Sequence, residues 1–377
     1  MCSKNITNDR SSFSGKIDEI PGIYVDNFNI INKRAYFLSH CHTDHTEGLY
    51  KEELLDFLEG NKNTYIYMSD ASAHIVEHEN NKLKSYLKVL SLGEPTVVEL
   101  RAVPEENLEE CIITVTAVPA GHCLGSIMFL FQTTRKTILY TGDFRISLND
   151  VKKYREFHKP SDRTEPIGVD AMYIDTTFYN KNYDDFMKRK DAIDYLIKEI
   201  KDWLNKDRNN QIALSISAKY GYEKVFNDIY KKLQVKVYVG DSIWKLYRKM
   251  PDKVIGVTND ATNTRIHVCY NKWPRHSHAN CVKTNTEANY LFVRLSAMTW
   301  KNYTSEDAPF EMCERDKRLN VCFSTHCSRN ELVYFISYFA PKKVVGFPNP
   351  YMGCEKALVI KENVSDFTFP PRKRFRR

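Results

Sequence analysis

Three histidines and an aspartate occupy six consecutive positions early in the chain, within the segment FLSHCHTDHTEG at residues 37–48. They follow an apolar stretch at residues 35–38 that is typical of a strand. On a helix the first two histidines would point about 200° apart, so the cluster suits a loop at a strand's end. Imidazole and carboxylate ligands suit Zn²⁺ and tolerate Mn²⁺. The segment therefore predicts part of a metal centre, with the candidate ligands His40, His42, Asp44 and His45.

Further candidate ligands lie far along the chain, each at the edge of a predicted strand. They are His122 in VPAGHCLGSIMFLF, Asp143 in TILYTGDFR, Asp175 in AMYIDTTF and His326 in VCFSTHCS. Taken singly, the last two would more often be hydrogen-bonded structural residues. A sheet, however, could gather all four on one rim beside the first cluster. Two divalent ions about 3.5 to 4 Å apart can lower the pKa of a bridging water towards about 7 and can clamp a phosphodiester.

The first third of the chain reads as short strands that could carry these groups. A helix is expected from Asp70 or Ala71 to about Glu77, with Asp70 as its cap. Residues 151–167 are polar and contain Pro160 and Pro166, so we interpret them as the crossing between two domains. The expected strands are residues 35–38, 65–68, 112–118, 126–131 and 137–140.

The region beyond this crossing alternates between helical and strand patterns. Apolar residues at helical spacing over 193–204 are followed by a strand at 212–216, a helix near 221–233 and a strand at 235–239. This alternation is typical of a parallel α/β sheet. The charges at 181–208 have mixed sign and fit the solvated face of an amphipathic helix better than a nucleic-acid patch.

Composition limits the class of protein. A chain of 377 residues with 42% hydrophobic content suits two domains or one domain with an insertion. The absence of an 18-residue apolar run and of a signal-like start leads us to expect a soluble, intracellular protein with no membrane partner. In that setting the ten cysteines indicate reduced thiols or metal ligands rather than disulfides.

The net charge of +7 does not by itself indicate a nucleic-acid partner. Five basic residues lie within the last six positions, and without them 50 basic residues face 48 acidic ones, a balance of +2. This basic tail fits a nuclear localisation signal or a phosphate-binding patch, and a plain solvated terminus is an equal alternative.

The motifs together resemble the metallo-β-lactamase fold nucleases that carry a β-CASP domain, specifically the DNA cross-link repair group. The segment AKYGYEKVF at 218–226 and Cys41 are more similar to one member of this group than to its exonuclease relatives. The matching segments, in order and spacing, are RAYFLSHCHTDHTEGL, PAGHCLGSIMFLFQ, ILYTGDFR, YIDTTF and FSTH.

The resemblance implies an αββα metallo-β-lactamase sandwich with an inserted α/β β-CASP domain. The sandwich would comprise residues 1–167 and 319–377, the second part ending in the basic tail, and the β-CASP domain would comprise residues 168–318. His40, His42 and His122 would hold one metal ion. Asp44 and His45 would hold a second ion. Among the remaining residues, Asp143 would bridge the ions, His326 would approach the second ion and the scissile phosphate, and Asp26 and Asp175 would orient ligands.

The same resemblance suggests a structural zinc ion in the β-CASP domain. Tyr238 stands where the family has a histidine ligand, so either His276 or His278 completes a tetrahedral site, or the site is weakened or lost. Pro350 occupies the last β-CASP motif, where the absence of histidine favours DNA over RNA. The candidate zinc ligands are His267, Cys269 and Cys281.

The implied function is a nuclear, metal-dependent DNA nuclease that opens hairpins, trims overhangs and degrades 5′ ends during non-homologous end joining. One or two divalent ions, Zn²⁺ with Mg²⁺ or Mn²⁺ possible, would serve as cofactors. The implied partners are DNA ends, hairpins and single strands, the DNA-dependent protein kinase catalytic subunit and the end-joining ligase complex, and we expect a monomer. The alternatives are a 5′ exonuclease for cross-link or telomere repair, an inactive end-binding scaffold, and a small-ester or lactam hydrolase.

Overall fold

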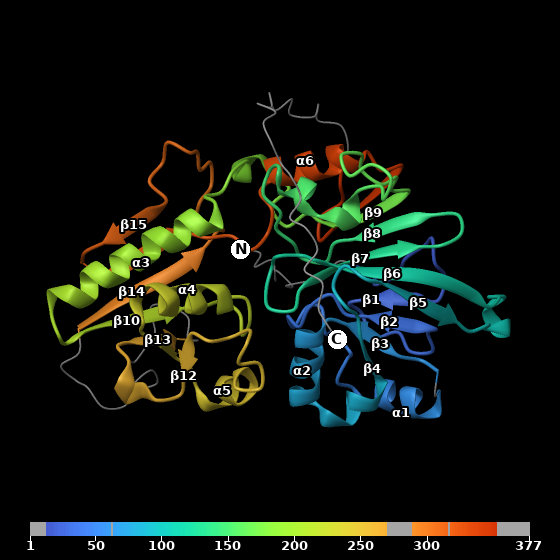
Figure 1. Ribbon diagram of the computed structural model, residues 1–377, viewed down its shortest axis with the longest axis horizontal. Coiled ribbons are helices and arrows are strands. Elements are labelled where there is room, and N and C mark those ends of the chain that lie inside the picture. The colour runs from blue at the N-terminus through green and yellow to red at the C-terminus, as the bar shows by residue number, and fades with distance from the viewer. Residues whose placement is uncertain (1–12, 62, 270–288, 316, 353–377) are drawn as a thin grey trace, which may run out of the picture.

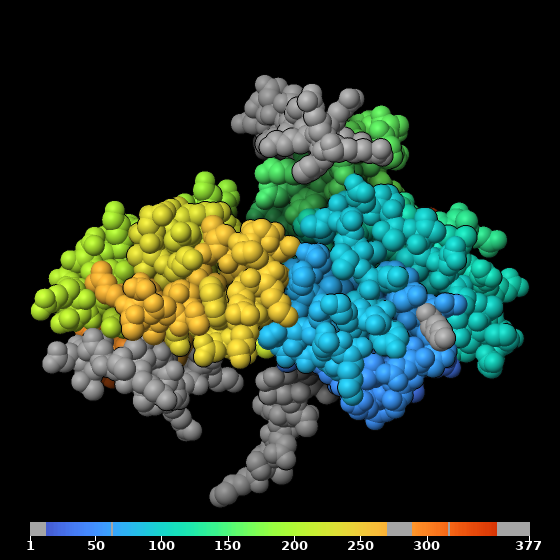
Figure 2. Space-filling model, turned by 60° about the horizontal axis from the view of Figure 1, so that its bottom comes forward, coloured from blue at the N-terminus to red at the C-terminus, as the bar shows by residue number. Residues whose placement is uncertain are grey.

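The computed structural model describes residues 13–61, 63–269, 289–315 and 317–352. Two lobes lie side by side, one built mainly from the N-terminal half of the chain and the other from residues of about 189–322 (Figure 1). Figure 2 shows the two lobes in contact, with the blue and cyan lobe against the yellow and orange one. Among the described residues, none of the helices combines the length and apolar character that a membrane-spanning helix requires.

The first lobe contains two sheets. A parallel sheet has the order β1-β2-β3-β4, and a mixed sheet has the order β17-β9-β8-β7-β6-β5. The strands of the first are Ile23–Val25, Ala35–Phe37, Ile66–Met68 and Leu87–Val89. Those of the second, from β5 to β9 and then β17, are Pro95–Leu100, Cys111–Pro119, Ile127–Gln132, Thr137–Tyr140, Ala171–Asp175 and Lys343–Phe347.

The two sheets pack face to face and helices cover their outer faces. Phe37 of β2 meets Phe129 and Phe131 of β7 edge-on, with ring centroids 5.4 and 4.9 Å apart. Helices α1 (Glu52–Gly60) and α2 (Asp70–Glu79) pack on the parallel sheet, and α6 (Arg329–Phe339) packs on the mixed one. These four layers confirm the predicted αββα sandwich.

The second lobe is one seven-stranded sheet of order β12-β11-β13-β10-β14-β16-β15, in which only β15 is antiparallel. Helices α3 (Arg189–Lys206), α4 (Glu223–Leu233) and α5 (Asp241–Tyr247) share one apolar core with its strands. This confirms the predicted parallel α/β region. From β10 to β16 the strands are Asn210–Ser215, Val237–Tyr238, Val257–Thr258, Ile266–Cys269, Asn289–Ser296, Phe310–Cys313 and Arg318–Cys322.

Three expectations differ from the structure. Residues 151–167 do not cross between lobes, because β9 follows them and pairs in parallel with β8; the chain leaves the first lobe only after Asp175. At the other end, β16 pairs with β14, so residues 319–322 belong to the second lobe and not to the sandwich, where the predicted boundary at 319 placed them. The cap of α2 is Ser69, whose side chain accepts a hydrogen bond from the Ser72 amide, while Asp70 is the first helical residue.

A buried ion pair between Arg145, in the loop after β8, and Glu331, in α6, lies behind the predicted site. The Arg145 side chain donates to both carboxylate oxygens of Glu331 at 3.2 Å and also to the carbonyl of Ser324 at 3.0 Å. Arg145 lies two residues after Asp143, and Ser324 lies two residues before His326. The pair therefore ties the loop that carries one predicted ligand to the loop that carries another.

We predict that Glu331→Ala lowers the free energy of unfolding by about 3 to 5 kcal/mol, because it leaves the enclosed Arg145 guanidinium without its counter-charge. Urea denaturation followed by circular dichroism measures this. The control is Asp150→Ala, which removes the exposed pair with Lys153 and should cost less than about 1 kcal/mol. Equal effects of the two substitutions would contradict the structural role of the buried pair.

Candidate metal centre

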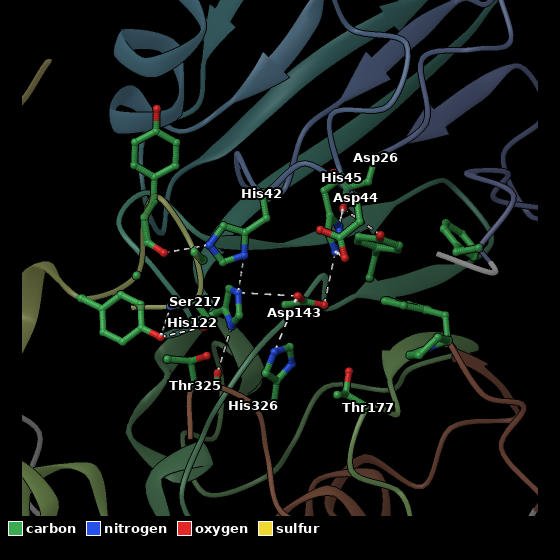
Figure 3. A pocket seen from close by; sticks show the side chains of 18 residues that line it. Asp26, His42, Asp44, His45, His122, Asp143, Thr177, Ser217, Thr325 and His326 are labelled. Carbon is green, nitrogen blue, oxygen red and sulfur yellow. Dashed lines mark hydrogen bonds and ion pairs between the residues drawn. The ribbon is translucent and has the colours of Figure 1, made fainter. Parts of the chain in front are cut away.

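The predicted ligands converge on a cavity of about 390 Å³ that residues of both lobes line (Figure 3). Each ligand lies in a loop that begins at the carboxyl end of a strand. The loops follow β2, β6 and β8 in the first lobe and β16 in the second, and Asp175 is the last residue of β9. Strand ends are rigid, so the loops hold side chains from distant parts of the sequence in one place. The predicted site residues among the lining side chains are Asp26, His42, Asp44, His45, His122, Asp143 and His326.

Three imidazoles are anchored through Nδ1 by acidic or hydroxyl side chains. Asp26 lies 2.9 Å from Nδ1 of His45, and Asp175 lies 2.7 Å from Nδ1 of His326. Ser39 Oγ lies 3.0 Å from Nδ1 of the fully buried His40. In each ring the other nitrogen, Nε2, is directed towards Asp143. Carboxylates that hold the outer nitrogen of a metal-binding histidine fix the orientation of the ring and raise its basicity.

The other two imidazoles are anchored by backbone carbonyls of the second lobe. His42 Nε2 lies 3.0 Å from the carbonyl of Tyr220, and His122 Nδ1 lies 3.1 Å from the carbonyl of Thr325. A carbonyl oxygen can only accept a hydrogen bond, so these two ring nitrogens carry the protons. In the neutral rings the remaining nitrogens, Nδ1 of His42 and Nε2 of His122, therefore present lone pairs.

Those two lone pairs face each other at 3.0 Å. Such an approach is repulsive unless a cation or a proton lies between the nitrogens. Burial lowers the pKa of His42 and lowers that of His122 well below the ordinary value, which disfavours the proton. Nε2 of His40 is also buried and has no hydrogen-bond partner among the described residues. This donor set fits a divalent metal ion.

Asp143 lies at the centre of the group. One carboxylate oxygen is 3.6 Å from Nε2 of His40 and 3.5 Å from Nε2 of His122, and the other is 3.4 Å from Nε2 of His45. The candidate ligand atoms of His40, His42, His122 and Asp143 all lie within 4.8 Å of one another. A carboxylate between two sets of imidazoles can bridge two ions. Histidine neighbours hold the pKa of Asp143 well below its usual range despite its burial, so the carboxylate is ionised.

Three predicted site residues lie farther from this centre. Asp44 is at the rim, with its side chain 42% exposed and one oxygen 4.0 Å from Nε2 of His45. Asp26 accepts hydrogen bonds from Ser39 and Tyr140 besides its contact with His45, so its role is to hold a ligand. Asp175 similarly accepts from Thr177 and contacts His326.

The protonation states divide the imidazoles into two groups. Burial lowers the pKa of His40 well below that of an ordinary histidine, as it does for His122. For His45 the effect of burial is outweighed by Asp143 and Asp26, which raise the pKa well above its usual value. Asp175 and Asp143 likewise outweigh burial at His326 and raise its pKa to about 9. The imidazoles of His45 and His326, which lie beside carboxylates, therefore keep their protons and their positive charge when no metal ion is bound.

Several contributors to the site were not predicted. The carbonyls of Tyr220 and Thr325 have no signal in the sequence, because any residue can supply a carbonyl. Phe347 and Pro348 line the cavity, whereas Pro350, the residue assigned to the last β-CASP motif, is not among its lining residues. The hydroxyl of Tyr140 is also placed only by the fold, through its 2.8 Å bond to Asp26.

The predicted structural zinc site lies partly outside the described residues. His267 and Cys269 are two apart on β13, and Tyr238 is the partner of His267 on β11, so the three share one face of the sheet. Cys281, His276 and His278 are not described, and this zinc site remains a prediction.

The sandwich and its histidine-aspartate centre are of the metallo-β-lactamase type, and comparison with known families supports this. Residues 252–350 match the model of a family described as DNA repair metallo-beta-lactamase. A solved structure, described as a protein of unknown function from Enterococcus faecalis V583, shares the fold with a TM-score of 0.51 and 16% identity, covering 83% of this chain and 74% of that one.

Among individual proteins, the chain resembles Artemis. It is 31% identical over 348 residues to protein Artemis of Rattus norvegicus and of Homo sapiens, covering 90% of this chain and 49% of each relative. It is also 37% identical over 155 residues to the 5′ exonuclease Apollo of Rattus norvegicus, covering 39% of this chain and 23% of the relative. The predicted resemblance to DNA cross-link repair nucleases is thus confirmed, and the chain spans about half the length of the Artemis proteins it matches.

We predict that the affinity for Zn²⁺ rises with pH between about 6 and 8, by about tenfold per pH unit for each proton displaced. The raised pKa of His45 means that this ring holds a proton at neutral pH, and a cation must displace that proton to bind at Nε2. Competition titrations with a chelator measure the affinity, and calorimetry in buffers of different ionisation enthalpy counts the protons. An affinity that is constant over this range would contradict the assigned protonation states.

Proposed function

We propose that this chain is a metal-dependent DNA nuclease that cuts structured DNA as an endonuclease, opening hairpins and trimming overhangs, and also degrades 5′ ends. We further propose that it acts in double-strand break repair by non-homologous end joining. The observation that carries the proposal is the pair of imidazole lone pairs facing each other at 3.0 Å beside the Asp143 carboxylate. The resemblance to Artemis over 90% of the chain supports the choice of DNA as substrate.

The residues present would hold two ions. His40, His42 and His122 would hold the first, His45 and Asp44 the second, and Asp143 would lie between them. When bound, such ions supply Lewis acidity to a phosphate oxygen and activate water for hydrolysis. The ligands of the second ion are less well placed than those of the first, because Asp44 must turn inward from the rim to reach the same ion as His45.

His326 is placed to handle a proton during cleavage. Its Nδ1 is held by Asp175, its Nε2 lies 3.9 Å from an oxygen of Asp143, and its pKa is raised to about 9 by those two carboxylates, which outweigh burial. A protonated Nε2 can give its proton to the leaving 3′ oxygen as the bond from phosphorus to that oxygen breaks. The products would be a 3′ hydroxyl and a 5′ phosphate.

The position of the centre favours a polymer over a small molecule. The cavity lies between two lobes, and side chains from both lobes form its wall. A lactam or small ester would need only the sandwich, whereas a nucleic acid can contact both lobes at once. The proposed partners are therefore DNA ends, hairpins and single strands. By the same resemblance we propose the DNA-dependent protein kinase catalytic subunit and the end-joining ligase complex as protein partners, and the nucleus as the location.

A 5′ exonuclease for cross-link or telomere repair is the second candidate. The similarity to the 5′ exonuclease Apollo favours it. The identity to Apollo, 37% over 155 residues, is higher than the identity to Artemis, 31% over 348 residues, although it covers a shorter stretch of the chain. An inactive end-binding scaffold is less well supported. A protein that only bound DNA ends would gain nothing from two neutral imidazoles held with their lone pairs facing each other.

We predict that Asp143→Asn abolishes cleavage of hairpin and overhang DNA, because the carboxylate that the ions would share loses its charge. Gel assays with labelled DNA in Zn²⁺, Mg²⁺ or Mn²⁺ measure this. Asp170→Asn is the matched control, since Asp170 precedes β9 and lies beside the first residue of β8, whereas Asp143 follows the end of β8. The hydrogen bonds of its side chain in the described structure are with the Thr137 amide and Lys342. Cleavage by the Asp143 variant at the wild-type rate would refute the mechanism.

We predict that a covalently closed dumbbell DNA, which has no 5′ end, is cut in its hairpin loops. An endonuclease needs no free end, whereas an exonuclease must start from one. The comparison substrate is the same duplex with open ends, carrying either a 5′ phosphate or a blocked 5′ end. Degradation of only the open, 5′-phosphorylated duplex would favour the exonuclease and exclude the structure-selective endonuclease.

A further inference from the structure

The second lobe takes part in the metal centre through a backbone peptide. His42 belongs to the first lobe, but the carbonyl that accepts the proton of its Nε2 belongs to Tyr220, in the connection between β10 and α4. A backbone carbonyl can orient a ligand only if its own peptide is held in place. The hydrogen bonds of Gly221 and Glu223 hold this peptide in place.

The peptide that joins Tyr220 to Gly221 is bonded at both of its ends. Its carbonyl faces His42 at 3.0 Å, and its N–H, which belongs to Gly221, donates to the two carboxylate oxygens of Glu223 at 3.1 and 2.9 Å. Since the peptide group is planar and trans, its C=O and N–H point in opposite directions. The result is a continuous line of hydrogen bonds from the imidazole through one peptide to the carboxylate.

Glu223 is itself firmly held. It is the first residue of α4 and only 4% exposed. The hydroxyl of Tyr247 in α5 donates to it at 2.7 Å. Leu124, two residues after His122, lines the same pocket wall as Glu223, and its backbone amide acts to lower the pKa of the carboxyl. The carboxylate thus joins α4 to α5 and lies beside the loop of a second metal ligand, where the two lobes meet.

Gly221 allows the peptide to come this close. Its φ of +115° is a conformation that other residues rarely adopt. A Cβ atom at this position would lie 3.4 Å from Cβ of Cys123 and 3.8 Å from Nε2 of His42. The connection therefore lies directly against the loops that carry His42 and His122.

We propose that Glu223 is a positioning residue for the metal centre, acting on His42 through the peptide between Tyr220 and Gly221. The inference rests on the proposed metal site and extends it. A carboxylate that bonds the N–H end of a peptide polarises it and strengthens its carbonyl as an acceptor. The carbonyl then fixes the tautomer of His42 and directs Nδ1 to the metal, as a directly bonded carboxylate does for other histidine ligands. Metal affinity consequently depends on the docking of the second lobe.

The test measures Zn²⁺ affinity of the full chain by competition with a chromophoric chelator, with no DNA present. Glu223→Ala should weaken the affinity about 10- to 100-fold, as is usual when a group that orients a metal ligand is lost. Glu223→Gln should weaken it about 3- to 10-fold, because a neutral amide oxygen holds the Gly221 N–H less strongly than a carboxylate. Circular dichroism and thermal unfolding establish that each variant is folded.

The matched control is Glu19→Ala. Glu19 is also an enclosed carboxylate that accepts a tyrosine hydroxyl, that of Tyr173 at 2.7 Å, but its partners in the described structure, Tyr173 and Lys343, lie outside the metal centre. This variant should lower the melting temperature and leave the Zn²⁺ affinity unchanged. Equal losses of affinity in the Glu19 and Glu223 variants would show a general effect of stability and overturn the proposal.

The remaining outcomes separate this inference from the proposed function. If wild type binds Zn²⁺ and Glu223→Gln binds it within about twofold of wild type, the role of Glu223 is wrong while the metal centre stands. The glutamine variant decides this even if the alanine variant does not fold. If wild type itself binds no Zn²⁺, the metal centre and the nuclease proposal fail together.

Discussion

Two imidazole nitrogens, one of the buried His122 and one of the half-buried His42, face each other at 3.0 Å, each with a lone pair, and are the constraint on which the centre depends. The outer nitrogens of these rings are committed to carbonyls of Tyr220 and Thr325, so neither ring can turn to relieve the repulsion without breaking a partly buried hydrogen bond. Losing such a bond costs about 1 to 3 kcal/mol. A cation between the nitrogens turns the repulsive contact into an attractive one, and the fold holds the rings ready for it.

The same principle extends to the other ligands. Each imidazole has one nitrogen bonded outwards and one directed inwards, and the outward partners come from different layers of the structure. Asp26 joins the ring of His45 to the hydroxyl of Tyr140 and to Ser39, across the interface between the two sheets. Behind the site, Arg145 and Glu331 join the loop of Asp143 to the loop of His326. The ligands therefore cannot move independently of the sheets.

The part of the metal centre that is made of side chains could be predicted from the sequence, because histidine and aspartate are residue types that bind metals. Histidines and aspartates directly after apolar strands indicated loops at the carboxyl ends of the strands, and the structure brings His40, His42, His122 and Asp143 together there. The boundaries of the domains and of the helices were harder to predict from the sequence. The polar stretch at 151–167 suggested a change of domain, but β9 returns to the first lobe because its buried residues complete the mixed sheet. Similarly, Ser69 caps α2 in place of the predicted Asp70. Serine and aspartate are both common helix caps, so the sequence alone could not distinguish between these two neighbours.

The sequence by itself determined which groups are available, namely imidazoles, carboxylates and the alternating patterns that make sheets of α/β type. Only the tertiary structure decided how each group is used. It left Asp44 at the rim and brought the Tyr220 carbonyl to His42 from 178 residues away. The reason is physical: a hydrogen bond depends on distance and direction in space, and a backbone carbonyl is the same in every residue until folding places it.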